Sequence, residues 1–222
     1  MTRDELNYLW ISEMEITEEE KQLRAKIITE FENEIETVFK EQDKINNSKL
    51  STAKKLLLLA LLNTSYRTAY TNVVTKYFRD YVKILVPNVG DISDFSREWL
   101  TNRSQTYANE VVRTTLKYFK NGEFERASEE SRRQTISRTE INAICECATL
   151  EGFIQEGYTR KMWETLLDGK ERDTHRKADK QIRNITEPFD VGESQLLFPC
   201  DSSLGAAAKE VINCRCHMSP MK

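Results

Sequence analysis

Glycine and proline are scarce in the first two thirds of this 222-residue chain. Only Gly90, Gly122 and Pro87 occur before residue 150, whereas five glycines and three prolines follow it. Both residue types interrupt helices, glycine through its backbone entropy and proline through its missing amide donor. The sequence therefore predicts a mainly α N-terminal two thirds with long helices, followed by a small α+β C-terminal domain with short strands.

The chain also lacks a long apolar segment and an excess of basic residues. Its most apolar run, LLLLALL at residues 56–62, is far shorter than the roughly 20 residues that span a bilayer. The N-terminal stretch MTRDELNYLWISEMEITEEE has no continuous apolar core, so we expect no signal peptide and a reducing cytosolic compartment. A net charge of -3 argues against a protein that mainly coats nucleic acid, because such binding needs clustered Lys and Arg.

Helix start and stop signals divide the N-terminal part. Thr17 and Glu20 have the spacing of a capping box, in which each side chain accepts a backbone N–H of the other. Apolar residues then recur at helical spacing as far as a polar break at residues 46–48. Further helical patterns cover residues 51–85, the segment from Ser93 to the Asn121-Gly122 turn, and a segment from about residue 128 that we expect to continue to residue 167.

The five cysteines form two C-x-C pairs and one single residue. Cys145 and Cys147 lie in a predicted helix, where residues two apart point about 200° apart around the axis. We therefore expect them to be core residues rather than ligands of one ion. Cys214 and Cys216 follow the strand-like stretch 210–212, and in an extended chain they would face the same side.

Four residues form a candidate structural zinc site: His175, Cys200, Cys214 and Cys216. Asp179 stands four residues after His175 and would orient its imidazole if that stretch is helical. A C-x-C spacing is tighter than the usual C-x₂₋₄-C of zinc sites. Simple packing and hydrogen bonding of these residues is the alternative interpretation, and His217 is expected at the surface.

A catalytic constellation is not recognisable, so we assign no catalytic residue and do not expect an enzyme. Cys214 with His175 would make a thiol nucleophile and base, but nothing supplies an oxyanion hole or an orienting third group. A Gly-rich phosphate loop is also missing. Asp168, Asp173 and Asp179 lie near His175, so the alternative function is a small metal-dependent hydrolase or nuclease, or a toxin-like domain, that uses His175. A plain DNA-binding module is a further alternative.

The order of several short motifs in residues 135–220 resembles a known family. The motifs are RTE, KMWETLLDGKERDTHRKADKQ, EPFDVGE, LFPCD and EVINCRC. They are similar to the C-terminal domain of phage head morphogenesis proteins, the group named for the Mu F protein and the SPP1 minor head protein. The matching positions are Arg138, Thr139, Glu140, Lys161, Trp163, Asp168, Arg172, His175, Asp179, Phe189, Gly192, Pro199, Asp201, Asn213, Cys214, Arg215 and Cys216.

Two residues depart from the family pattern. Lys180 stands where the family has the glycine of a D-G pair, and Cys200 stands where it has the glycine of Y-P-G-D. The second departure argues against Cys200 as a ligand shared by the family.

The resemblance implies a phage minor head (capsid) protein without enzymatic activity. Such a protein would bind the portal vertex and act in procapsid assembly, DNA packaging or DNA ejection. Scaffold, major capsid protein and packaged DNA are further implied partners, and a membrane is not. The implied location is the host cytoplasm during assembly and then the interior of the virion head. Residues 1–130 would be a helical region that contacts portal or capsid, and residues 131–222 the Mu F-like domain.

Several motif residues also carry structural expectations. An Arg–carboxylate pair among Arg138, Glu140 and Asp168 would hold its helix against the C-terminal sheet. Trp163 is expected in the core. Asn213 would hold the turn before the last strand through bonds to the backbone, and Arg215 would point away from the cysteines, towards solvent or a partner.

Overall fold

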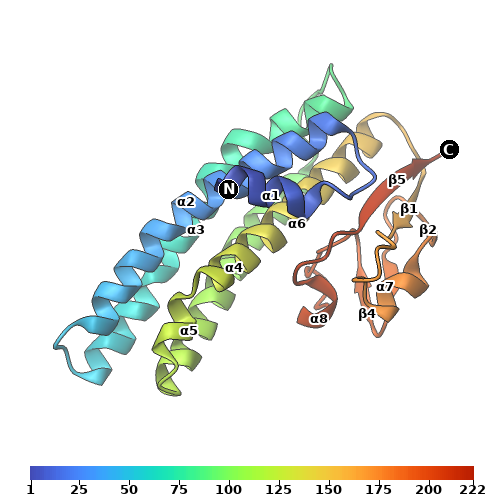
Figure 1. Cartoon of the computed structure of the whole chain (residues 1–222). Coiled ribbons are helices and arrows are strands. Elements are labelled where there is room, and N and C mark those ends of the chain that lie inside the picture. The colour runs from blue at the N-terminus through green and yellow to red at the C-terminus, as the bar shows by residue number, and fades with distance from the viewer.

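Long helices form the N-terminal part of the molecule, and short strands form the C-terminal part (Figure 1). The structure is a computed structural model that covers residues 1–222. The helical part contains α1 (Arg3–Ile11), α2 (Glu18–Asn47), α3 (Thr52–Leu85), α4 (Asp94–Lys120), α5 (Phe124–Ser128) and α6 (Glu130–Gln155). The remainder contains β1 (Arg160–Glu164), α7 (Asp173–Ala178), β2 (Ile182–Asn184), β3 (Phe189–Val191), β4 (Ser194–Leu196), α8 (Ala208–Val211) and β5 (His217–Met221). This order confirms the predicted fold class.

The predicted helix signals are found at the N-termini of α2 and α4. The Thr17 side chain accepts the backbone N–H of Glu20, and the Glu20 carboxylate accepts that of Thr17, which confirms the capping box. Ser93 caps α4 by accepting the backbone N–H of Ser96. None of the helices is long and apolar enough to cross a membrane.

The prediction that α6 continues to residue 167 is wrong. Gly157 adopts a φ of +73° directly after the helix, and its N–H bonds to the carbonyl of Ile154. The N–H of Tyr158 bonds to the carbonyl of Phe153. These two bonds and the left-handed glycine form a Schellman ending, which closes the helix and turns the chain into β1.

The strands form two small antiparallel sheets. β1 is the central strand of the sheet β2-β1-β5, while β3 and β4 form a separate hairpin. Trp163 on β1 is fully buried, as predicted. β5 also contacts α6, which itself packs against α2 and α3, so α6 is the helix on which the C-terminal part rests.

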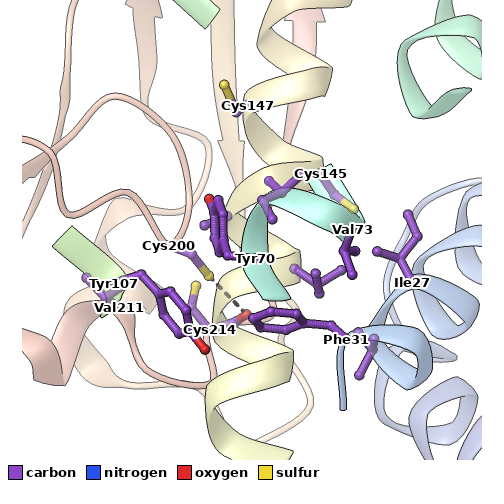
Figure 2. Close-up of a cluster of buried hydrophobic side chains, with 14 of the residues drawn as sticks. Ile27, Phe31, Tyr70, Val73, Tyr107, Cys145, Cys147, Cys200, Val211 and Cys214 are labelled. Carbon is purple, nitrogen blue, oxygen red and sulfur yellow. Dashed lines mark hydrogen bonds between the residues drawn. The ribbon is translucent and has the colours of Figure 1, made fainter. Parts of the chain in front are cut away.

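One hydrophobic core runs through both parts of the chain, from Ile11 to Met218. Its aromatic centre joins three helices: the ring of Tyr107 from α4 lies 5.7 Å from Phe31 of α2 and 5.3 Å from Tyr70 of α3. Figure 2 shows these rings beside Cys200 and Cys214 of the C-terminal segment. The division of the chain into residues 1–130 and 131–222 stays a prediction.

Candidate metal centre

Three of the four predicted zinc ligands lie together in the C-terminal part. His175 is on α7, and Cys214 and Cys216 lie between α8 and β5. Their ligand atoms, the His175 nitrogen and the two sulfurs, are all within 4.8 Å of one another. His175 Nδ1 is 3.3 Å from Cys216 Sγ and 3.6 Å from Cys214 Sγ. All three side chains are buried, so soft donors of the kind that bind zinc face one point away from water.

The two sulfurs converge for a different reason from the one predicted. Residues 208–211 form the short helix α8, not a strand, and β5 begins only at His217. Between them Asn213 has a φ of +52°, a left-handed conformation that asparagine tolerates better than most residues. The backbone N–H of Asn213 donates to Thr139 Oγ1 on α6 at 3.0 Å. The turn, anchored to α6, therefore sets the direction of Cys214 and Cys216.

Cys214 lies in an environment that favours its thiolate. Burial opposes ionisation, but hydrogen bonds with Cys200, Cys216 and His175 lower the pKa of the Cys214 thiol well below its usual value. The backbone N–H of Cys216 also lies 3.4 Å from Cys214 Sγ. The hydrogen bond with Cys214, together with burial, raises the pKa of Cys216.

Glu210, not Asp179, faces the imidazole of His175. Glu210 Oε2 lies 3.3 Å from His175 Nε2, which has no hydrogen-bond partner in the present geometry. The same carboxylate accepts the Thr174 hydroxyl at 2.7 Å, and Glu210 is only 1% exposed. α7 ends at Ala178, so Asp179 does not share a helical face with His175. The prediction for Asp179 is wrong, because its carboxylate instead accepts the backbone N–H of Thr165 at 2.8 Å.

Cys200 is outside the group of three donors. Its sulfur lies 3.5 Å from the carbonyl oxygen of Cys214 and 3.4 Å from the amide nitrogen of Asn142 on α6. Cys145 and Cys147 are buried free thiols, and Figure 2 shows them projecting from α6 in different directions. Their predicted place in the core is confirmed.

A small cavity opens beside the three donors. Its volume is about 30 Å³. Charged residues of the loop before α7 and of the segment after α8 stand around it. The lining residues are Leu166, Lys170, Glu171, Arg172, His175, Asn213, Cys214, Arg215 and Cys216.

Arg215 connects the cavity rim to the N-terminal region, and its side chain is 15% exposed. The prediction that it points to solvent is therefore wrong, while contact with a partner stays a prediction. The guanidinium of Arg215 bonds to the carboxylate of Asp168 and, at 3.1 Å, to that of Glu13. Burial alone would raise the pKa of Asp168. The hydrogen bonds from Arg215 and from the backbone of Lys170 outweigh burial and lower this pKa to about 2. Arg172 donates to the carbonyl of Ile212 and so joins α7 to α8.

The Arg-Thr-Glu motif on α6 makes contacts in three directions. Arg138 donates to Asn7 at 3.2 Å and lies over the ring of Trp10, so it joins α6 to the N-terminus. Thr139 accepts from Asn213, as described. Glu140 forms a bidentate ion pair with Arg103 of α4, a partner that sequence reasoning missed because the two residues are far apart in the chain.

The prediction that His217 lies at the surface is also wrong. This residue is 4% exposed, because it opens β5, which packs between β1 and α6. Burial lowers its pKa to about 4. It is therefore held neutral at physiological pH.

The sequence was compared with models of known protein families, and one of them matches. The model described as phage Mu protein F like protein matches residues 101–219. The match covers more than half of the chain and includes α6, β1 to β4, the first residues of β5 and the three donors. No curated protein and no solved structure matches the chain.

Proposed function

Because the chain belongs to the family of phage Mu protein F-like proteins, a family of phage head morphogenesis proteins, we propose that it is a minor head protein bound to the portal vertex. In this role it enters the procapsid and acts in head assembly, DNA packaging or DNA ejection. Scaffold, major capsid protein and packaged DNA are further partners of the same proposal. The observation that carries it is the family match over residues 101–219.

We assign the portal or capsid contact to residues 1–130 and regard residues 131–222 as the Mu F-like domain. Two leucines one helical turn apart on α3, Leu57 and Leu61, are 61% and 62% exposed. Neighbouring exposed leucines on one helix face are suited to burial against a partner. Leu57 and Leu61 are therefore the residues to replace in a test of portal binding.

The experiment is co-purification of this chain with the portal protein of the same phage. We expect a stable complex with the native chain and a weaker one with Leu57→Gln/Leu61→Gln. The matched control is Leu167→Gln/Leu204→Gln, since those leucines are 60% and 50% exposed in the C-terminal part. A native chain that does not bind portal would contradict the proposal. Equal loss in both double variants would contradict only the assignment to residues 1–130.

We also propose that His175, Cys214 and Cys216 hold a structural Zn²⁺. A metal in this position would join α7 to the segment after α8 and so stabilise a region with many turns and short strands. The support is the set of three buried donors that face one another.

Elemental analysis of purified protein tests the zinc proposal. We expect about one zinc per chain, and its loss in Cys214→Ser/Cys216→Ser. At a zinc concentration 100 times the Kd, the bound metal would contribute about 2.7 kcal/mol. The matched control is Cys145→Ser/Cys147→Ser, which changes another buried C-x-C pair outside the site and should keep its zinc. Folded native protein that contains no zinc when purified and takes none up when zinc is added would refute the proposal.

The alternative of a hydrolase, nuclease or toxin-like domain requires a concave pocket around His175. The cavity there is about 30 Å³, room for a water molecule or a small ion but not for a nucleotide or a peptide. This volume weighs against the alternative.

A further inference from the structure

The three donors supply only three corners of the tetrahedron that zinc prefers. Structural zinc sites usually have four protein ligands, whereas a site with three leaves one position to solvent. The identity of the fourth ligand thus decides whether the metal is enclosed by protein or exchangeable. The carboxylate of Glu171 lines the same cavity, but its two oxygens are bonded to the N–H of Gly169 and to Arg176. Two further side chains lie next to the donors, Cys200 and Glu210.

Cys200 lies on the core side of Cys214 and does not line the cavity. Its thiol shares a hydrogen bond with the Cys214 thiol, its sulfur contacts the carbonyl oxygen of Cys214 and the amide of Asn142, and it lies outside the cluster of donors. Its backbone φ of +66° is uncommon for a residue with a Cβ. The side chain is 1% exposed and contacts α6, so its present partners lie in the core.

Glu210 lies on the wrong side of the imidazole to bind the same metal. Nδ1 of His175 faces the two sulfurs, and Nε2 faces the Glu210 carboxylate. A neutral imidazole that binds metal through Nδ1 carries its proton on Nε2, and a carboxylate there fixes both the tautomer and the ring orientation. Glu210 is thus a positioning residue.

The remaining corner lies at the small cavity. All three donor residues line it, and its volume of about 30 Å³ exceeds the roughly 10–15 Å³ that a water molecule needs. Lys170, Arg172 and Arg215 also line it, together with one carboxylate, Glu171. Glu171 is already bonded to Arg176 and to the backbone N–H of Gly169, so basic groups outnumber acidic ones around the cavity.

We propose that His175, Cys214 and Cys216 form a three-ligand zinc centre whose fourth ligand is a water molecule, replaceable by a small anion from the cavity. Glu210 holds His175 in the Nδ1-binding form. The inference rests on the proposed zinc site and is independent of the proposed role at the portal.

Cobalt substitution tests the ligand set. The metal-free protein is titrated with Co²⁺ under reducing, anaerobic conditions, and the sulfur-to-cobalt charge-transfer band is recorded. With two thiolates, Cys214→Ser should lose about half of that band while Cys200→Ser keeps all of it. A band that falls by about a third in Cys200→Ser would identify a third thiolate and overturn the inference.

Azide added to the cobalt protein tests the open position. We expect its visible d–d bands to shift, because azide replaces water at the fourth corner. Unchanged bands at saturating azide would show a closed site and contradict the inference, even if zinc is present. Failure of the native chain to bind Co²⁺ would refute the zinc proposal and this inference together, whereas portal binding would be unaffected.

Glu210→Gln tests the positioning role. We expect metal affinity to fall about 10- to 100-fold, with the charge-transfer band unchanged in size at saturation. The control is Glu193→Gln, which changes an exposed carboxylate in the turn between β3 and β4 and should keep the native affinity. Native affinity in Glu210→Gln would contradict the role of Glu210.

Discussion

Arg103 joins three parts of the molecule at the scale of a single residue. Its guanidinium pairs with Glu140 on α6 and donates to Ser202 at 2.7 Å, so α4, α6 and the segment before α8 meet at one charge. Both members of the Arg103–Glu140 pair are 6% exposed in their side chains. Such a pair is costly to break, because the buried Arg103 would keep only Glu110 as an ionic partner, and that carboxylate is 3.4 Å away and 46% exposed.

Replacement of Glu140 by alanine should therefore lower the free energy of unfolding by about 3–5 kcal/mol. Asp80→Ala is the control, since it removes an ion pair with Lys83 in which the side chains are 50% and 54% exposed. That change should cost at most about 1 kcal/mol. Urea denaturation measures both, and equal losses would show that burial does not determine the value of the Arg103–Glu140 pair.

Lys161 is the second residue whose burial has a measurable consequence. It lies on β1, is fully buried, and donates to the carbonyl of Leu197 at 2.7 Å. Its ammonium also lies 5.2 Å from the ring centre of Phe189. Burial disfavours the charged form and lowers the pKa of Lys161 to about 8.

This shift predicts that stability increases with pH. Between the folded pKa of about 8 and the ordinary value of 10.5, the unfolded chain holds a proton that the folded chain has released. The contribution of Lys161 to the free energy of unfolding should rise by about 3 kcal/mol across that window. Lys161→Met should remove this part of the rise, while the exposed control Lys117→Met should keep it. The same rise in all three proteins would contradict the pKa assignment.

At the scale of elements, the turn between β3 and β4 supports the candidate metal centre. Gly192 has a φ of +63°, and a Cβ there would lie 2.9 Å from Thr174 Cγ2 and 3.0 Å from Glu210 Oε1. Gly205 has a φ of +81°, and a Cβ there would meet nothing within 4 Å. Replacement of either glycine would strain the backbone, but only a side chain at position 192 would also collide with neighbouring atoms. A comparison of the two variants therefore distinguishes the two effects.

Gly205→Ala should cost about 1–2 kcal/mol, the ordinary penalty of a left-handed conformation. Gly192→Ala should cost more, and it should also weaken zinc binding because the new methyl group displaces Glu210. Thermal unfolding and zinc content measure the two effects. If both variants kept full zinc affinity, the link from this hairpin through Glu210 to His175 would be wrong.

The elements show which features of the fold were predictable from sequence. Local signals sufficed for the capping box at Thr17 and for the change from helices to strands. The end of α6 was missed because it depends on the φ of Gly157, which the apolar pattern does not report. His217 was misplaced because its burial comes from the packing of β5 against distant elements.

The candidate site was predictable only where its residues are of rare types. The rare residue types, His175 and the C-x-C pair, stand out in a chain with two histidines and five cysteines. Glu210 does not stand out among 36 acidic residues, and only the fold brings it to His175. Arg103 is likewise one of many basic residues, and its pairing with Glu140 depends on how α4 and α6 pack.

At the scale of the whole molecule, the two ends of the chain are connected. Glu13, just after α1, pairs with Arg215 near the C-terminus at 3.1 Å, and the hydrophobic core is continuous from one part to the other. Binding of a partner to the long helices would therefore act on a body that includes the candidate metal centre. This connection is compatible with the proposed role at the portal.

The amount of this chain in procapsids tests the central claim most directly. Procapsids assembled with and without the portal protein are purified, and their composition is measured by quantitative mass spectrometry. We expect a few copies of the chain per procapsid when portal is present and none when it is absent. Incorporation without portal, or absence from procapsids that contain portal, would contradict the account of a minor head protein bound to the portal vertex.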